Sequence, residues 1–223
     1  MAALPFVTLK FAISLDGRIA TKTGDSQWIS SSDSLQFAHQ LRVEHDAIMV
    51  GIGTVLADNP RLNVRLVEGR DPLRVIVDGR LQIPITANVL IEEAAKNTLI
   101  ATTDAADEGR LAEIRNLGAE VLRLPAEEGT GRVNLQALLA ELHRRAVQSI
   151  LVEGGAGIIT ALLSARLVNR MVVAIAPKII GQGIEAVGDL GITKLADALD
   201  FTSFKTERLG PDMIFDGLLK DKS

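Results

Sequence analysis

The sequence predicts an α/β protein with a mostly parallel central sheet, flanked by helices and followed by a C-terminal antiparallel hairpin. Two observations support this fold class. Short apolar runs alternate with helical patterns along most of the chain, which is the rhythm of strand–helix–strand units. Most of these runs are continuous, as expected for strands that are covered on both faces. Because the 223 residues contain no linker or internal repeat, we expect a single domain over 1–223 with a core at about 5–218.

The strands are predicted from short apolar runs. They are expected at 6–13, 46–50, 73–77, 97–101, 119–124, 149–152 and 171–176. The strand–helix rhythm changes after Pro177, where the stretches 200–210 and 212–220 are typical of a closing antiparallel pair.

Helices are predicted from the spacing of apolar residues and from capping residues. The stretch 134–146 places its leucines on one stripe, with Asn134 as the N-cap. The stretch 107–117 has the same periodicity and ends at Gly118, a natural C-terminal cap. A further helix is expected to start with Ser32 or Asp33 as its cap and to run to about Glu44.

The composition excludes several classes of protein. A net charge of −4 and a pI near 5.5 argue against a nucleic-acid or anionic-membrane surface. No apolar run reaches the length of a membrane span, about 18 residues, and the first residues lack the pattern of a signal peptide. With zero cysteines there is no disulfide, thiolate zinc site or cysteine nucleophile. We therefore expect a cytoplasmic protein without a metal site.

The first of four candidate clusters lies near the N-terminus. Lys10 interrupts an apolar strand, and such a lysine must meet an anion or lie at an open edge; a lysine that extends to the surface is equally consistent with its position. The only tryptophan, Trp28, stands in a polar loop after the turn Asp16–Gly17. Trp28 is either a plug on the back of the fold or the wall of a binding site.

The second and third clusters each follow a predicted strand. Gly51 and Gly53 let a ligand approach the backbone, and Thr54 adds a hydroxyl, although G-x-G alone is a weak signal and a plain loop is the alternative. The stretch 77–80, "VDGR", stands where dinucleotide folds meet the adenosine ribose. Its arginine can hold a 2′-phosphate, or the stretch is only a β-turn.

The fourth cluster is the most specific. The apolar stretch 149–152 leads into Glu153, Gly154 and Gly155, and a helix follows at once. Free N–H groups and the positive dipole of a helix N-terminus suit a pyrophosphate. All four clusters follow strands of one parallel sheet, and ligands bind outside the carboxyl ends of such strands. The sequence therefore predicts a nucleotide site, while the residue pattern by itself does not name a reaction.

Several strings resemble one family. "VTLKFAISLDGRIA", "GDSQWISS", the pair "LR" at 41–42, "GIGTVLADNPRLNVR" and "LVEGGAGI" look like the pyrimidine reductase of riboflavin biosynthesis, the RibD C-terminal type, from about 5 to 217. The resemblance implies a dihydrofolate-reductase-like fold, a homodimer, and reduction of the ribosyl group of a phosphorylated aminopyrimidine to ribityl with NADPH.

The resemblance also assigns roles to residues. The cofactor-contacting positions it implies are Ala12, Trp28, Thr54, Asp58, Gly155, Ala156, Gly157, Ile158, Ile159, Thr160 and Ala161. The strand-end clusters add Gly79, Arg80 and Gly154 to the expected cofactor site. The substrate positions are Lys10, Ser26, Arg42, Leu62, Arg65 and Glu153. We expect Lys10, Asp58 and Glu153 to serve the chemistry, since ring opening before hydride transfer needs a proton donor. Two arginines can bind a ribose 5-phosphate.

The sequence departs from the family pattern at two points. Relatives often carry Ser or Thr where this chain has Gly79; Arg80 can compensate, which keeps NADPH favoured over NADH. The bifunctional enzymes of the family also have a zinc deaminase with cysteine ligands, whereas this sequence starts at the reductase and has no cysteine. We therefore expect either that another protein supplies the deaminase activity, or that the substrate is the diamino pyrimidine. Two other interpretations stay open: a reductase of another heterocycle, such as a pterin or dihydrofolate, and a non-catalytic nucleotide-binding module.

Overall fold

The computed structural model of the protein describes residues 3–27 and 29–220. The chain forms two compact units: unit 1 comprises Met1–Pro5 and Arg42–Ile150, and unit 2 comprises Phe6–Leu41 and Leu151–Ser223. The boundaries fall within helix α1 (Ser32–Glu44) and strand β7 (Ser149–Glu153), so both elements contribute to the two units.

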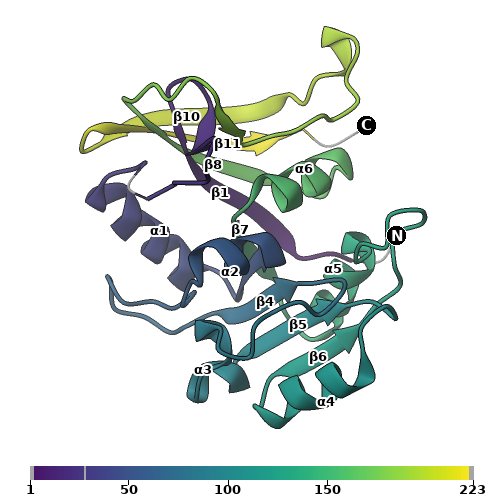
Figure 1. Ribbon diagram of the computed structural model, residues 1–223. Coiled ribbons are helices and arrows are strands. Elements are labelled where there is room, and N and C mark those ends of the chain that lie inside the picture. The colour runs from purple at the N-terminus through teal and green to yellow at the C-terminus, as the bar shows by residue number, and fades with distance from the viewer. Residues whose placement is uncertain (1–2, 28, 221–223) are drawn as a thin grey trace. The chain divides into compact units, whose positions relative to one another are not determined.

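Unit 1 is built on parallel strands with helices beside them (Figure 1). Its strands are β3 (Ala47–Gly51), β4 (Leu73–Val77), β5 (Thr98–Thr102) and β6 (Glu120–Arg123), paired in this order. Its helices are α2 (Ile52–Asp58), α3 (Glu93–Lys96), α4 (Glu108–Asn116) and α5 (Leu135–Arg144), with a 3₁₀ turn η1 (Asn88–Leu90). The register pairs Gly51 with Val77 and Val77 with Ala101, so the carboxyl ends of β3, β4 and β5 share one edge.

The core of unit 1 explains why these strands read as continuous apolar runs. Ile48, Ile76 and Ile100 from three neighbouring strands are fully buried, and Leu111 and Ile114 of α4 belong to the same cluster. The capping predictions for two helices are confirmed. The Asn134 side chain accepts a hydrogen bond from the Ala137 N–H at the start of α5, and Gly118 follows α4 with a positive φ of 97°.

Unit 2 contains parallel and antiparallel pairs (Figure 1). Its strands are β1 (Phe6–Ser14), β2 (Arg18–Thr21), β8 (Arg170–Ala176), β9 (Gly183–Glu185), β10 (Phe201–Leu209) and β11 (Asp212–Leu219). Its helix α6 (Ala156–Ser164) follows β7, and a 3₁₀ turn η2 (Leu195–Asp197) precedes β10. The strand order β10-β11-β8-β1-β7 places β1 and β8 side by side and parallel, whereas β11 is antiparallel to both β8 and β10.

One face of the unit 2 strands packs against α1. Phe37 and Leu41 of α1 contact a cluster that includes Leu151 of β7, Val172 of β8 and Ile214 of β11. Ala12 of β1 packs against the same cluster. This face therefore carries the even-numbered residues of β1 and the odd-numbered residues of β7.

The predicted fold class is confirmed: the sheet is mostly parallel, and an antiparallel hairpin lies at the C-terminus. Every expected strand is present, and each end differs from the expected bound by at most one residue. One cap is wrong. Helix α1 already includes Ser32, and the Ser31 hydroxyl accepts the Ser34 N–H, so Ser31 is the capping residue. The small β2–β9 sheet was not expected, because "RIAT" and "GIE" are too short to show a period.

Candidate active site

The candidate residues of unit 1 gather at the carboxyl edge of its strands. Gly51 ends β3, and α2 begins at the next residue, so Gly53 and Thr54 lie in its first turn. A Cβ atom added at Gly53 would meet nothing within 4 Å, which leaves the backbone open to a ligand. Gly79 and Arg80 follow β4 at the same edge. The structure thus brings the second and third predicted clusters together, as expected for neighbouring parallel strands.

Asp58 ends α2 and is the residue of unit 1 that we expect to take part in proton transfer. Desolvation by the surrounding protein raises the pKa of its carboxyl group above 3.8, although the residue remains exposed. Asn59 then closes the helix in a left-handed conformation with a φ of 41°. Its side-chain oxygen accepts the Asn88 N–H at 2.8 Å, which fixes the point where the chain leaves the helix. A carboxyl group with a raised pKa retains its proton at higher pH and is better suited to donate one.

The Arg61–Arg65 segment follows α2 and contains no helix or strand. Leu62 has a φ of 51°, yet its side chain is only 3 % exposed and joins the core of unit 1. A left-handed conformation costs a residue with a side chain about 1–2 kcal/mol. The burial of Leu62 stabilises the segment against that cost. We predicted Leu62 as a substrate position; its side chain belongs to the core, so the ligand contact left to it is through the backbone.

The two predicted phosphate-binding arginines differ in their surroundings. Arg42 of α1 is only 7 % exposed, and its Nη1 donates to the Asn63 carbonyl oxygen at 2.7 Å. Arg65 is exposed, and its Nη1 donates to Asn63 Oδ1 at 3.1 Å. Both arginines therefore meet at Asn63. Arg65 has the exposure that an anion-binding arginine needs, whereas Arg42 supports the segment.

The turn after β4 depends on Asp78 and Gly79. Asp78 is fully buried, and its Oδ2 accepts the Ile83 N–H at 2.8 Å. Burial raises the pKa of Asp78 above 3.8, although the neighbouring backbone N–H groups oppose this shift. A Cβ atom added at Gly79 would lie 3.1 Å from the Gly131 carbonyl oxygen, so a serine or threonine here would need the 131–133 stretch to shift. Arg80 is exposed beside this turn.

In unit 2, Lys10 and Glu153 lie on the same face. Lys10 precedes Ala12 by two residues in β1, Glu153 follows Leu151 by two in β7, and Ala12 and Leu151 share one cluster. Both ionisable residues are partly buried. Lys10 is not at an edge, because β8 and β7 flank β1. Of the positions considered for Lys10 from the sequence, the open edge of the sheet is therefore excluded.

The turn between β7 and α6 has the predicted open backbone. Gly154 has a φ of 143°, a conformation that side chains rarely adopt, and Gly155 is the N-cap of α6. A Cβ atom added at Gly157 would meet nothing within 4 Å. The Thr160 hydroxyl donates to the Ala156 carbonyl oxygen and accepts the Gly188 N–H. Ile158 and Ile159 are buried, so of the stretch 154–161 the backbone of the first turn is what remains available to a diphosphate.

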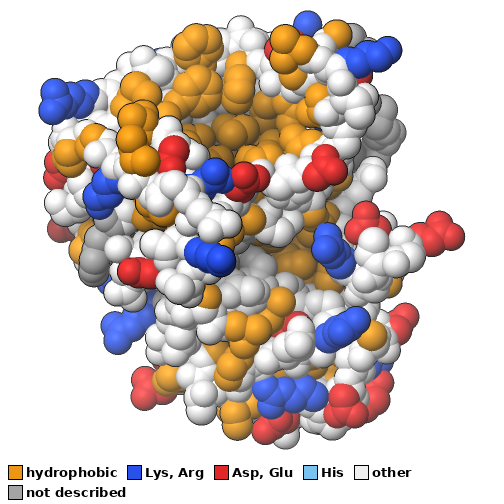
Figure 2. All heavy atoms as spheres, turned by 45° about the horizontal axis from the view of Figure 1, so that its top comes forward, with side chains coloured by type: hydrophobic (Ala, Val, Ile, Leu, Met, Phe, Trp, Pro, Cys, Tyr) orange, Lys and Arg blue, Asp and Glu red, His pale blue; other side chains and the backbone are white. Residues whose placement is uncertain are grey.

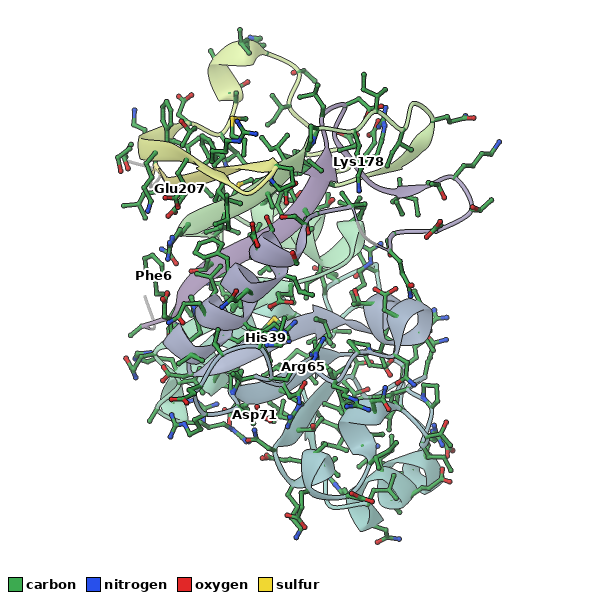
Figure 3. All side chains as sticks on the ribbon, turned by 90° about the vertical axis from the view of Figure 1, so that its left-hand side faces the viewer. Phe6, His39, Arg65, Asp71, Lys178 and Glu207 are labelled. Atoms are coloured by element: carbon green, nitrogen blue, oxygen red, sulfur yellow. The ribbon has the colours of Figure 1, made fainter. Side chains whose placement is uncertain are left out.

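The stretch 29–31, which follows Ser26 in the chain, is held by Lys178, two residues after β8, and by Asp212, the first residue of β11. Lys178 donates from Nζ to the Ile29 carbonyl oxygen at 3.0 Å (Lys178 is labelled in Figure 3). Asp212 Oδ2 accepts the Ser31 N–H at 2.8 Å, the Ser31 hydroxyl at 2.8 Å and the Ser34 hydroxyl at 2.6 Å. Ser26 itself is partly buried. Trp28, the residue whose role was left open, lies outside the described residues.

A second carboxylate supports the same part of unit 2. Asp16 accepts the Ser14 hydroxyl at 2.6 Å and the N–H groups of Ile180 and Gly181 at 3.1 and 2.6 Å. These hydrogen bonds lower the pKa of Asp16 from 3.8 to about 2. The turn Asp16–Gly17 is therefore more than a reversal of direction, because its carboxylate joins it to the 178–181 stretch.

Sequence reasoning missed the residues that hold these segments. Arg74 is 4 % exposed in β4, and Asp71 lies three residues before it. An arginine inside the apolar run "LRVIV" was a usable signal, since a buried arginine requires a carboxylate or carbonyl partner. Asp212 had no such signal, because it stands before an apolar strand like any turn residue. Among the described residues there is no cluster of histidine and carboxylate side chains that could hold a metal ion, and no helix long and apolar enough to cross a membrane.

The fold and the candidate site together identify the structural class of this protein. Unit 1 has ligand-accessible glycines at a carboxyl edge, and unit 2 has a glycine turn at a helix N-terminus and two ionisable residues, Lys10 and Glu153, on one face. The fold is that of dihydrofolate reductase: the enzyme from Enterococcus faecalis matches 97 % of this chain with a TM-score of 0.51 at 11 % identity, which bears on the fold alone.

The family follows from closer similarities. The family model named RibD C-terminal domain matches residues 5–215, and the chain belongs to this family. The 2,5-diamino-6-ribosylamino-4(3H)-pyrimidinone 5′-phosphate reductase of Methanothermobacter thermautotrophicus is 40 % identical over 97 % of this chain and 99 % of its own length. The riboflavin biosynthesis protein RibD of Aquifex aeolicus is 39 % identical over 94 % of this chain, which spans only 56 % of that protein. The structure of Acinetobacter baumannii RibD has a TM-score of 0.84 at 30 % identity, and the match covers 98 % of this chain and 59 % of that one.

Proposed function

We propose that the protein is an NADPH-dependent reductase that converts the ribosyl group of a ribosylaminopyrimidine 5′-phosphate to ribityl. The observation that carries this proposal is the match, over nearly the full length of both chains, to a relative named as such a reductase. Two features support it: Lys10 and Glu153 lie on one face of unit 2, and Arg65 is exposed in unit 1. Ionisable side chains of these types are what an opened, phosphorylated sugar requires.

NADPH fits the residues that would hold it. In unit 2, the N–H groups at the start of α6 and the open position at Gly157 leave room for a diphosphate. In unit 1, Gly53 is open to a ligand, and exposed Arg80 supplies a cation for a 2′-phosphate. Thr54 and Asp58 add polar groups after β3, and Ala12 is a small residue on the face that carries Lys10. When bound, NADPH supplies the hydride, and the protein supplies alignment and electrostatics.

The protein residues act on the sugar. The ribosylamine must open to an imine before C1′ can accept a hydride, and this step moves a proton to the ring oxygen. In our proposal Lys10 Nζ donates a hydrogen bond to the opened sugar, and the Glu153 carboxylate orients its hydroxyl groups. The Asp58 carboxyl group, with its raised pKa, is the proton donor. Ser26 is the remaining substrate contact in unit 2, and Arg65 binds the phosphate.

A homodimer is part of the proposal. Hydrophobic side chains gather over the β10–β11 end of unit 2 (Figure 2), where Phe204 is 66 % and Met213 is 44 % exposed. Phe204 stacks on Phe215 with ring centroids 5.4 Å apart. Exposed apolar surface of this kind typically marks an interface between proteins. We place the reaction in the cytoplasm, where NADPH and phosphorylated intermediates are available.

Turnover of the two candidate substrates tests the function. The deaminated and the diamino ribosylaminopyrimidine phosphates are offered separately with NADPH, and consumption of the cofactor is followed by absorbance. We expect NADPH to be consumed with at least one of them, and the faster one identifies the substrate. NADPH consumption with dihydrofolate but with neither pyrimidine would contradict the proposal.

A further inference from the structure

Thr103 donates two hydrogen bonds to one atom, the carbonyl oxygen of Gly79, at the carboxyl edge of β4 and β5. Its main-chain N–H contacts this oxygen at 3.2 Å, and its Oγ1 contacts it at 2.8 Å. The first bond continues the parallel ladder, in which the Asp78 N–H donates to the Ala101 carbonyl oxygen at 2.9 Å. The second bond comes from the side chain, so Thr103 adds a contact that strand pairing alone does not provide.

The hydroxyl group of Thr103 is engaged with main-chain atoms of unit 1. Its oxygen accepts the Ala105 N–H at 3.2 Å, and its single proton is donated to Gly79. The residue is only 1 % exposed. Breaking a buried hydrogen bond of this kind leaves an unpaired polar group, which is costly. The fold therefore fixes the position of the Gly79 oxygen before any ligand arrives.

The Gly79 carbonyl group belongs to the peptide that leads into Arg80. Because a peptide unit is planar, the direction of this oxygen also sets the positions of the Arg80 N and Cα atoms. Glycine permits a wide range of backbone conformations, so this peptide needs a contact that selects one. After Arg80, the Leu81 N–H closes a turn to the Asp78 carbonyl oxygen at 3.1 Å, and the Leu81 side chain is buried in the core. Arg80 is thus an exposed residue between two fixed points.

We infer that Thr103 is a positioning residue for cofactor selection: it holds the Gly79–Arg80 peptide in the orientation that presents the Arg80 guanidinium to the 2′-phosphate of the cofactor. This inference rests on the proposed function for the identity of the cofactor. Since Thr103 is buried and acts through Arg80, its hydroxyl should matter only for a ligand that carries the 2′-phosphate. Threonine suits the position, because its methyl group lies 3.7 Å from where a Cβ atom of residue 79 would be and so fits beside a glycine.

Adenosine 2′,5′-bisphosphate is the probe, because it carries the 2′-phosphate without a nicotinamide. Adenosine 5′-monophosphate is the control ligand, and binding of both is measured by calorimetry. We expect Thr103→Val and Thr103→Ala, which lack the hydroxyl, to bind the bisphosphate about three- to tenfold more weakly than the wild-type protein does. Their affinity for the monophosphate should be unchanged. Thr103→Ser keeps the hydroxyl and should retain the wild-type preference.

Thr98→Val is the matched control variant. Thr98 is also buried in unit 1, at the start of β5, and its hydroxyl donates to the carbonyl oxygens of Val89 and Ala94 at 2.8 Å. Loss of this hydroxyl should lower the melting temperature, as in Thr103→Val, and should leave the affinities for both ligands unchanged. This control separates a general loss of stability from a change in ligand preference.

A double variant tests whether Thr103 acts through Arg80. Because Arg80→Ala removes the group that Thr103 positions, Thr103→Ala should cause no further loss of bisphosphate affinity in that background. The inference would be overturned by wild-type preference in Thr103→Val and Thr103→Ala, by equal losses for the two ligands, or by additive losses in the double variant. Equal affinity of the wild-type protein for the two ligands would overturn it as well. The expected binding pattern without NADPH consumption on either pyrimidine would instead count against the proposed function.

Discussion

The Arg61–Arg65 segment of unit 1 and the Ser26–Ser31 segment of unit 2 carry candidate substrate residues, and each is fastened by one carboxylate. Asp71 accepts a main-chain N–H of its segment and is paired with the buried cation Arg74, whereas Asp212 accepts hydrogen bonds from one N–H group and two hydroxyl groups. The first arrangement depends on a charge partner inside the protein, and the second on neutral donors. The two segments should therefore respond differently to substitution and to pH.

Removal of the buried cation should have the largest effect. Arg74→Met leaves the Asp71 carboxylate without its counter-ion and the Arg61 carbonyl oxygen without its donor. Since Asp71 remains partly exposed, we expect a loss of about 2–4 kcal/mol in the free energy of unfolding, measured in urea. Arg132→Met, at an exposed position of the same unit, should cost little. A loss for Arg74→Met as small as that for Arg132→Met would mean that the ion pair does not hold the segment.

Asp212→Asn tests the neutral arrangement. Burial alone would raise the pKa of Asp212, but hydrogen bonds from Ser31 and Ser34 and the charge of Lys178 lower it overall, so the carboxylate is ionised. The amide keeps one acceptor oxygen and loses the charge, and we expect a loss of about 1–3 kcal/mol. Unfolding in urea provides the measurement. Asp200→Asn, at an exposed carboxylate of unit 2, is the control; a loss for Asp212→Asn as small as that of the control would contradict this account.

Arg80 sharpens the contrast between arginines that support the fold and arginines that bind. Arg80 is exposed, so Arg80→Ala should leave the free energy of unfolding nearly unchanged. If it binds the 2′-phosphate, the affinity for NADPH should fall by about 1.5–3 kcal/mol while that for NADH stays the same. Kinetic constants for both cofactors provide the measurement, and equal losses for the two would exclude Arg80 from the 2′-phosphate site.

The smallest expected effect is the loss of the Asp16 hydrogen bonds at low pH. The pKa of Asp16 is lowered to about 2, so its hydrogen bonds to the 180–181 stretch contribute stability above its ordinary pKa of 3.8. That contribution is lost as the pH falls from about 4 toward 2. The amide NMR signals of Ile180 and Gly181 should titrate with a midpoint near the lower value, and Asp16→Asn should abolish the titration. A midpoint at the ordinary value would show that these hydrogen bonds are weak in solution.

Much of the fold could be predicted because it depends on local patterns. The apolar runs of β3, β4 and β5 and the Asn134 cap are visible within a few residues of sequence. The Ser31 cap was missed by one position, because three consecutive serines and an aspartate offer equivalent side chains there and Asp212, far along the chain, favours one of them. The choice between equal local candidates is made by a tertiary contact.

The sequence was sufficient to predict which segments carry the candidate site. It was less informative about the role of each side chain. Gly154, Gly155 and Glu153 stand where the pattern placed them. Arg42 and Arg65 were predicted as a matched pair, but one is buried and the other exposed. The burial of these two arginines depends on how the Arg61–Arg65 segment packs, and this segment contains no helix or strand whose periodicity could predict it. The same reason hid Asn63, whose significance comes from two arginines that the sequence places on either side of it.

The central claim, hydride transfer to the sugar of a phosphorylated aminopyrimidine, is tested most directly with NADPH that carries deuterium at the reactive carbon of its nicotinamide. The wild-type protein is incubated with the labelled cofactor and the preferred ribosylaminopyrimidine phosphate, and the product is examined by mass spectrometry and NMR. We predict a ribityl product with deuterium at C1′. A product without deuterium, or deuterium in the pyrimidine ring with the ribosyl group unchanged, would contradict the account.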